Sequence, residues 1–138
     1  MSIPMSSFTV ADVMLPLDRF PCVSSRELFK QALEKMNEKK LGIACILNQS
    51  GKLLGVLTDG DIRRNLLTDQ KPLSALFIDD ALEHAELMPL TVSPQLSLAQ
   101  AVQIMEEKQV WDLPVVNSAN ILVGLLHLHP AIKVLLSL

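Results

Sequence analysis

Gly51–Leu67 reads GKLLGVLTDGDIRRNLL, and a weaker copy of this stretch, NILVGLLHLHPAIKVLL, follows at Asn120–Leu136. A shift of 69 residues aligns residues 21–67 with residues 90–136 without a gap, and 13 of these 47 pairs are identical. Chance would give roughly three identities, so the chain contains an internal repeat, and the repeat sets its architecture. A unit of about 60 residues is marginal alone, and we therefore expect the two units to share one core.

The composition is that of one compact domain without a membrane segment. The 138 residues are 49% hydrophobic and the mean hydropathy is +0.33, which is high for a soluble domain. No apolar run approaches the ~18 residues that a membrane-spanning helix needs, so we expect no membrane contact. We expect the apolar surplus to cover an interface with a second copy or with a domain outside this chain.

Charge and residue usage argue against several classes of partner. A net charge of −3 provides no basic footprint for nucleic acid. With 4% aromatic residues and no Tyr, a carbohydrate platform or a single-strand binder is disfavoured, because both stack ligands on aromatic rings. Cys22 and Cys45 lack CxxC spacing, and no signal peptide precedes them, so we expect two reduced core thiols in a cytoplasmic protein.

The first repeat is expected to run strand, helix, strand, turn, strand, helix. A helix is predicted from the apolar residues at i, i+3, i+4 and i+7: Phe29, Ala32, Leu33 and Met36. Ser24 or Ser25 is expected to cap this helix, with Glu27 in its first turn. Residues 20–23 and the apolar run 41–47 are predicted strands, 52–57 the hairpin partner, and 61–67 a second helix.

The second repeat repeats this order. Residues 91–92 are expected to be extended, Ser97 to start a helix, and residues 110–116 and 121–126 to form a hairpin. Pro130 suits the first turn of the last helix. Short helices are predicted at 9–14, as a lead-in to the first repeat, and within 72–88. We place the first repeat at residues 9–70 and the second at 71–138.

Residues 58–61 carry polar chemistry at the end of an apolar strand. The free N–H groups of a helix start and the Thr58 hydroxyl favour a phosphate, and Gly60 allows close approach of a ligand. Asp61, which only accepts hydrogen bonds when ionised, suits the paired hydroxyls of a ribose. The alternative is structural: Asp61 caps the helix and Thr58 ends a strand.

The second copy of this turn has different residues. The shift of 69 places His127 opposite Thr58, His129 opposite Gly60 and Pro130 opposite Asp61, so the acid is absent there. The histidines form an HxH pair that suits a phosphate or a metal, but no nearby acid or Cys is expected to complete a ligand set, and we predict no metal site. His84 is expected to be isolated at the surface.

No motif for catalysis is present. The sequence lacks GxxxxGK[ST], GxSxG and HExxH, and no base or nucleophile pairs with Asp59 and Asp61. We therefore predict no catalytic residues, no required cofactor and no enzyme activity for this chain alone.

Two segments resemble the signatures of the cystathionine-β-synthase (CBS) domain: Leu113-Pro-Val-Val-Asn117 and Gly55-Val-Leu-Thr-Asp-Gly-Asp61. The resemblance covers about residues 9–136 as a tandem pair and implies an α/β fold of two pseudosymmetric β-α-β-β-α repeats. GVLTDGDIRR followed by LVGLLHLH is further similar to the CBS pair at the C-terminus of arabinose-5-phosphate isomerases, and TDGD-h-RR also occurs in some sugar nucleotidyltransferases. The isomerase family often keeps an Asp after its HxH, so Pro130 is a departure that puts a second nucleotide site in doubt.

The resemblance implies a site shared between repeats. The ribose-binding acid of one repeat, here Asp61, is expected to face Val110 and Trp111 of the other, and Trp111 suits stacking on a base. An alternative is that Trp111 lies in the core or in a dimer interface. Arg63 or Arg64 is expected to hold a phosphate, or both are solvated at the surface. The expected ligand-binding residues are Thr58, Gly60, Asp61, Arg63, Val110 and Trp111.

The resemblance also implies a regulatory function. We expect a module that senses an adenine nucleotide (AMP or ATP) or a sugar nucleotide such as a CMP-sugar, and that modulates a sugar isomerase domain in cis. A homodimer through the CBS helices is expected. The alternatives are a dimerisation scaffold without a ligand, or the CBS pair of a sugar nucleotidyltransferase.

Overall fold

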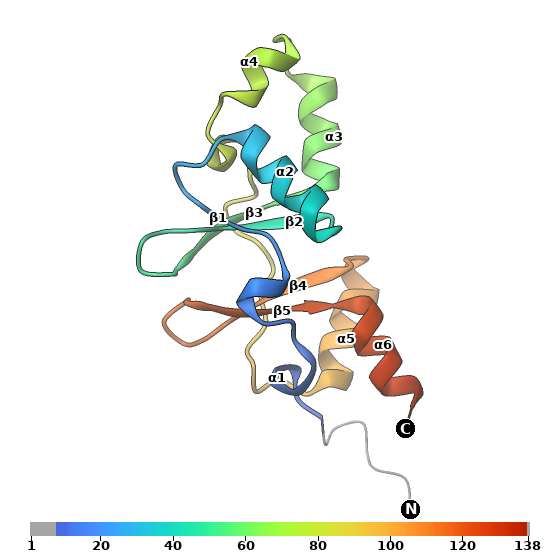
Figure 1. The fold of residues 1–138 in the computed structure, drawn as a ribbon. Coiled ribbons are helices and arrows are strands. Elements are labelled where there is room, and N and C mark those ends of the chain that lie inside the picture. The colour runs from blue at the N-terminus through green and yellow to red at the C-terminus, as the bar shows by residue number, and fades with distance from the viewer. Residues whose placement is uncertain (1–7, 138) are drawn as a thin grey trace, which may run out of the picture. The chain divides into compact units, whose positions relative to one another are not determined.

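A computed structural model describes residues 8–137, which fold into two compact units, residues 18–89 and residues 90–137 together with the segment 8–17 (Figure 1). The elements in chain order are α1 (Val10–Val13), η2 (Leu17–Arg19), β1 (Cys22–Ser24), α2 (Phe29–Lys39), β2 (Ile43–Leu47), β3 (Leu53–Thr58), α3 (Asp59–Thr68), α4 (Leu73–Phe77), η3 (Ala81–His84), α5 (Leu98–Lys108), β4 (Asp112–Val116), β5 (Leu122–His127) and α6 (Leu128–Leu136). The predicted α/β class with β-α-β-β-α repeats is confirmed. None of the described helices has the length and apolarity to cross a membrane.

The unit of residues 18–89 contains a three-stranded sheet in the order β1-β2-β3. β1 runs parallel to β2, and β2 and β3 form an antiparallel hairpin whose register pairs Ile43 with Thr58. Helix α2 packs on this sheet because one of its faces is apolar, as the spacing predicts. The core cluster consists of Val23, Phe29, Ala32, Met36, Ala44, Ile46, Leu57, Leu76 and Ala81.

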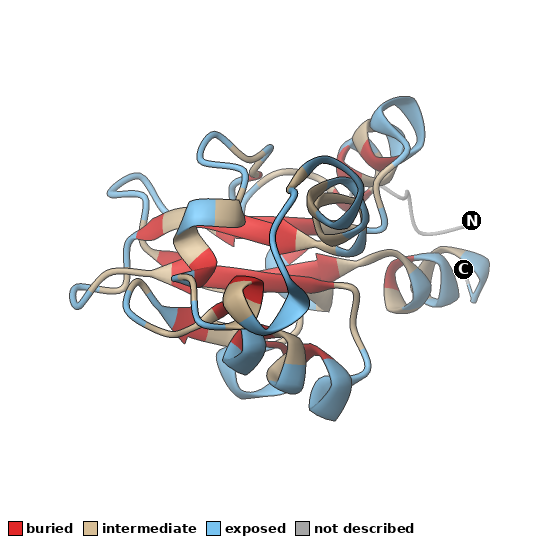
Figure 2. Ribbon diagram, turned by 90° about the horizontal axis from the view of Figure 1, so that it is seen from above, coloured by how far each residue is buried: buried red, intermediate tan, exposed pale blue. Residues whose placement is uncertain are grey.

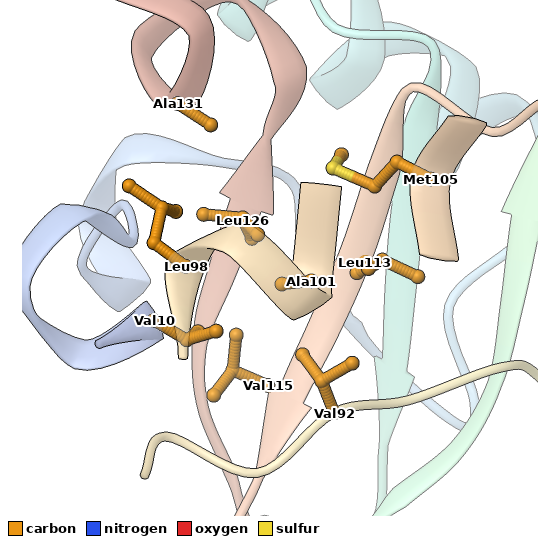
Figure 3. Packing of buried hydrophobic residues seen from close by; sticks show 9 residues of the cluster. All are labelled: Val10, Val92, Leu98, Ala101, Met105, Leu113, Val115, Leu126 and Ala131. Carbon is orange, nitrogen blue, oxygen red and sulfur yellow. The ribbon is translucent and has the colours of Figure 1, made fainter. Parts of the chain in front are cut away.

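The other unit repeats these elements at a shift of 69 residues. β4 and β5 form the antiparallel hairpin, and Asp112 pairs with His127 as Ile43 pairs with Thr58. The strand expected at residues 91–92 is reduced to one parallel bridge between Val92 and Val115. Figure 3 shows the side chains that fill this core: Val10, Val92, Leu98, Ala101, Met105, Leu113, Val115, Leu126 and Ala131.

In each unit the hairpin of one repeat pairs with a segment from the N-terminal part of the other repeat. Leu15 exchanges backbone hydrogen bonds of 2.8 and 3.1 Å with Leu125, while Glu86 exchanges bonds of 2.8 and 3.0 Å with Val56. The helix expected as a lead-in to the first repeat, α1, therefore packs with the second, since Val10 belongs to that core. The repeats 9–70 and 71–138 remain a division predicted from sequence, and the compact units follow a different one.

One helix start differs from its prediction. Ser24, Ser25 and Glu27 do not open α2: the Ser24 N–H donates to Glu27 Oε1 at 3.3 Å within a turn, and the helix begins at Phe29. The Phe29 N–H donates instead to the carbonyl of Asp79 at 2.8 Å. The acceptor thus comes from a distant segment, which local capping rules do not reveal. Ser97 does cap α5, accepting from the Gln100 N–H at 3.2 Å.

Burial follows the strands. Figure 2 shows the buried residues concentrated along the strands, with exposed residues on the outer helix faces and in the loops. The predicted short helices within 72–88 are α4 and η3, and Leu76 and Ala81 are their buried residues. Large apolar side chains remain exposed on the two helices that follow the hairpins: Leu66, Leu67, Ile132 and Leu136.

Candidate functional site

The candidate site lies where β3 ends and α3 begins. The Asp59 N–H donates to the carbonyl of Gly42 at 3.1 Å, which fixes the helix start against the residue that precedes β2. A Cβ atom added to Gly42 would lie 2.5 Å from Asp59 Oδ2, so the Asp59 carboxylate sits directly over this glycine. Gly42 thus shapes the site, although it was not among the residues expected there.

Thr58 and Asp61 form a reciprocal cap at this helix start. The Asp61 N–H donates to Thr58 Oγ1 at 3.2 Å, while the Thr58 N–H and hydroxyl donate to Asp61 Oδ2 at 3.0 and 2.9 Å. This arrangement satisfies backbone donors that would otherwise lack partners at the helix start. It also holds the Asp61 carboxylate, whose side chain is 15% exposed, at the mouth of α3.

The second oxygen of Asp61 contacts an arginine. Arg64 Nη2 donates to Asp61 Oδ1 at 2.6 Å, and the Arg64 side chain is 64% exposed. A Cβ atom on Gly60 would lie 3.3 Å from Arg64 Nη1, so the guanidinium folds over the glycine. Both carboxylate oxygens therefore have partners: Oδ2 accepts from the cap, and Oδ1 accepts from an exposed guanidinium.

The structure brings three of the expected residues together: Thr58, Gly60 and Asp61. Arg63 is exposed and takes no part in the cap or in the pair with Asp61, whereas Arg64 does. The i, i+3 spacing of Asp61 and Arg64 on one helix was the sequence signal for this pair. The helix-capping interpretation of Asp61 describes its present contacts, and a ligand role requires Arg64 Nη2 to give way.

The other two expected residues belong to the second unit. Val110 is partly buried against the core of that unit. Trp111 is 70% exposed, so it is not a core residue there, and its carbonyl accepts from the Leu128 N–H at 2.9 Å. An exposed indole is free to stack on a base or to enter an interface, and both interpretations of Trp111 stay open.

The turn at residues 127–130 shares the backbone of the first site but not its chemistry. His127 precedes α6 without capping it through its side chain, and His127 Nδ1 lies 2.7 Å from Asp112 Oδ1. Asp112 is thus an acid beside His127 that was not anticipated, while the prediction of no metal site at the HxH pair stays a prediction. The hairpin register places Asp112 opposite His127, so the predicted hairpin was sufficient to predict this pair.

His84 is also not where we expected it. Its side chain is 7% exposed, Nε2 lies 2.9 Å from Asp79 Oδ2, and Nδ1 lies 3.6 Å from Asp69 Oδ2. Its ring packs on Phe29 with centroids 5.0 Å apart. The prediction of an isolated surface histidine is wrong, because the segment after α4 folds back on α2 and carries His84 inward.

Three groups in the unit of residues 18–89 have shifted pKa values. Burial raises the pKa of the Cys22 thiol to about 11, against the opposing effect of Lys35 and Lys39. A hydrogen bond with Asp79 raises the pKa of Lys71, and the same bond, followed by the one with His84, lowers the pKa of Asp79. The thiol of Cys22 is therefore protonated at neutral pH, which makes it a poor nucleophile.

Known relatives match most of this chain over part of their own length. Arabinose 5-phosphate isomerase KdsD of Pseudomonas aeruginosa is 33% identical over 125 residues, which are 90% of this chain and 37% of the relative. An uncharacterised protein of Helicobacter pylori is 33% identical over 122 residues, 87% of this chain and 35% of the relative. The chain thus spans about a third of the length of these relatives.

Solved structures agree with the fold. CBSX2 in complex with AMP superposes with a TM-score of 0.82 and 26% identity, covering 94% of this chain and 97% of that one. The CBS-pair protein CBSX2 from Arabidopsis thaliana gives a TM-score of 0.80 at 25% identity, covering 94% and 95%.

The family model of the CBS domain matches twice, at residues 10–68 and 85–129, and so covers more than half of the chain. The two matches fall on the two repeats, and each contains one β-β hairpin with its preceding helix. A CBS pair is a regulatory module and not a catalytic one, which agrees with the prediction that this chain alone is no enzyme. The chain belongs to the CBS domain family, in which it forms a tandem pair.

Proposed function

We propose that this chain is a ligand-sensing module that binds an adenine nucleotide or a sugar nucleotide at Asp61 and modulates an arabinose-5-phosphate isomerase domain in cis. The observation that carries the proposal is the Asp61 carboxylate, held by Thr58 at the start of α3 with its Oδ1 turned to an exposed arginine. Ligand binding would favour one of two states of the chain, and its differential affinity would set the size of the effect on the isomerase.

The chemistry of the site supports a ribose and a phosphate. When ribose hydroxyls approach Asp61 Oδ1, they take the place of Arg64 Nη2, and the cap on Oδ2 keeps the carboxylate in position. The released guanidinium then lies within reach of the ligand's phosphate, for which its fork of donors is suited. Gly60 leaves room for this exchange. We also propose Val110, Trp111 and Arg63 as ligand-binding residues, as the resemblance to CBS pairs implies.

The comparisons support the ligand class and the partner domain. CBSX2, 26% identical over nearly the whole chain, has been solved with AMP. KdsD is an arabinose 5-phosphate isomerase of which this chain matches about a third, so we place the isomerase domain in the remainder of such a protein. We further propose a homodimer through the CBS helices and a cytoplasmic location, with no cofactor required.

A second candidate function is a scaffold that only assembles copies or domains. Four exposed apolar side chains on α3 and α6 favour it: Leu66, Leu67, Ile132 and Leu136. Both oxygens of Asp61 already have partners, and Pro130 replaces the acid in the second copy. A CBS pair of a sugar nucleotidyltransferase is the remaining alternative, and it differs only in the domain attached.

A thermal-shift panel tests sensing against scaffolding. The chain is heated with AMP, ATP, CMP, a CMP-sugar and S-adenosylmethionine, and we expect at least one nucleotide to raise the melting temperature. An equal melting temperature with every ligand would instead support the scaffold.

The variant Asp61→Asn tests the site itself. The amide keeps the size of the side chain and one oxygen for the Thr58 N–H, but it loses the charge and the second acceptor. We expect the nucleotide-induced shift to vanish, measured against the variant's own melting temperature without ligand. Asp59→Asn, two residues away in the same helical turn, is the matched control and should keep the shift. An unchanged shift in Asp61→Asn would refute the site.

A further inference from the structure

The unit of residues 18–89 contains a second cluster of polar side chains, apart from the start of α3. Asp79, Glu83 and His84 each place a ligand atom within 4.8 Å of the other two. They line a surface pocket together with Asn65, Asp69 and Lys71. The cluster therefore combines an imidazole with carboxylates in a surface pocket.

The histidine is the unusual member. The side chain of His84 is 7% exposed, and both of its ring nitrogens face carboxylates, Asp79 at 2.9 Å and Asp69 at 3.6 Å. A neutral imidazole has one N–H and one lone pair, so it can donate to only one of these acids. In that form the other nitrogen offers a lone pair, which can serve as a metal ligand beside the carboxylate oxygens.

The charge of the cluster also favours a cation. Asp69, Asp79 and Glu83 contribute three carboxylates, and Lys71 Nζ is the ammonium within reach, 2.7 Å from Asp79 Oδ2. The Lys71 side chain is 42% exposed and long, so it can leave without disturbing the core. The pocket thus already holds a cationic group that a small ion could replace.

We propose that Asp79, Glu83 and His84 form a binding site for a divalent transition-metal ion such as Zn²⁺. Imidazole nitrogen with carboxylate oxygens is a donor set that suits zinc and its neighbours, whereas Mg²⁺ and Ca²⁺ prefer oxygen alone. One ring nitrogen of His84 binds the ion, and the other donates its N–H to Asp69, the orienting contact found for most metal-bound histidines. The ion displaces Lys71 from Asp79.

This site is independent of the nucleotide site and was not expected from the sequence. The sequence offers the HxH pair at residues 127–129 as a metal candidate and predicts an isolated His84. The cluster forms only because α4 and η3 bring residues 79–84 against the end of α3. In the other unit the equivalent of Asp79 is Phe8, because the Phe8 carbonyl accepts from the Leu98 N–H at the start of α5, as the Asp79 carbonyl accepts from the Phe29 N–H at the start of α2. We therefore expect one metal ion per chain.

Calorimetric titration of the whole chain with Zn²⁺, in a buffer that does not chelate metal, tests the proposal. We expect saturable binding of one ion per chain and a melting temperature that rises with Zn²⁺. Glu83→Gln should weaken binding by at least about tenfold, and because Glu83 is exposed this variant should fold normally. Glu38→Gln, an exposed acid on α2, is the matched control and should change nothing.

Removal of the Lys71 charge gives a result that a purely structural cluster would not give. Lys71→Met removes the competing ammonium, so we expect tighter Zn²⁺ binding than in the wild type, although a favourable pair is lost. Asp61→Asn should leave Zn²⁺ binding unchanged, which separates this site from the nucleotide site. Absence of saturable binding would overturn the proposal. Binding that survives Glu83→Gln but is lost in His127→Gln or His129→Gln would also overturn it.

Discussion

The two hairpins of this CBS pair have the same backbone and end in different chemistry. Helix α5 begins and ends 69 residues after α2, and the strands of the second hairpin follow those of the first by the same number. The register shifts after Ile46 in the first hairpin and after Val115 in the second. At the first hairpin's end Thr58 and Asp61 cap the helix, whereas at the second His127 pairs with Asp112 across the strands. Identical geometry therefore does not imply an equivalent site.

The comparison shows which positions the fold requires and which it leaves open. Lys40 and Gln109, at the ends of the equivalent helices, both adopt left-handed conformations with φ near 58° and 55°. Gly51 and Asn120 do the same in the hairpin turns, at 85° and 62°. These positions tolerate different side chains because only the backbone conformation is fixed. The fold constrains the residues at the starts of α3 and α6 even less, and the two repeats differ there.

The largest expected effect tests a feature that the two repeats share, a glycine in the hairpin. Gly55 and Gly124 both lie where another segment crosses the hairpin closely. A Cβ on Gly55 would lie 2.8 Å from the Glu86 carbonyl oxygen, which is held by its hydrogen bond to Val56. We expect Gly55→Ala to lower the free energy of unfolding by about 2–3 kcal/mol, measured by urea denaturation, because backbone must move.

The same change in the second half serves as its control. A Cβ on Gly124 would lie 2.5 Å from Met14 Sδ and 3.0 Å from the Leu15 carbonyl oxygen. A methionine side chain adapts more readily than a paired carbonyl, so Gly124→Ala should cost less than Gly55→Ala. The reverse order would show that the two crossings are not held as the contacts indicate.

The next effect tests a feature in which the two repeats differ, the side-chain cap of the helix after the hairpin. Thr58→Val keeps the shape of the side chain but removes the hydroxyl that accepts from the Asp61 N–H. We expect a loss of about 1 kcal/mol in the free energy of unfolding, while Thr58→Ser stays near the wild type. His127→Thr should bring no cap to α6, because Pro130 has no N–H at the equivalent position. Full stability of Thr58→Val would show that the hydroxyl is not the cap.

The sequence predicted most of the fold because hydrophobic periodicity and the repeat point to the same elements. The helix face of Phe29, Ala32 and Met36, both hairpins and the short helix at Val10–Val13 are confirmed. Of the predicted site residues, Thr58, Gly60 and Asp61 lie together because they are neighbours at one helix start. Whether that group binds a nucleotide stays a prediction.

The errors share a cause, which is contact between distant segments. The start of α2 depends on the Asp79 carbonyl, and the burial of His84 depends on the fold of residues 79–84 against Phe29. Neither contact has a local sequence pattern. The pairing of Asp112 with His127 was within reach, because a predicted hairpin fixes which residues face each other.

The smallest expected effect concerns a titrating group that only the first half holds. Cys22 on β1 has Thr91 as its counterpart at the shift of 69. Burial raises the pKa of Cys22 from 9.0 to about 11, so the folded chain keeps the thiol proton over a pH range in which the unfolded chain loses it. The stability that this proton linkage contributes is fully present below pH 9 and is lost as the pH rises towards 11.

Cys22→Thr gives the first half the residue of the second and should remove this part of the alkaline loss. We expect the free energy of unfolding of the variant to fall less steeply than that of the wild type between pH 9 and 11, as urea denaturation at several pH values would measure. Thr91→Val, a change without a titrating group, should leave the slope as it is. Parallel slopes for Cys22→Thr and the wild type would mean that the thiolate is as well solvated in the fold as outside it. The halves would then not differ at this position in their response to pH.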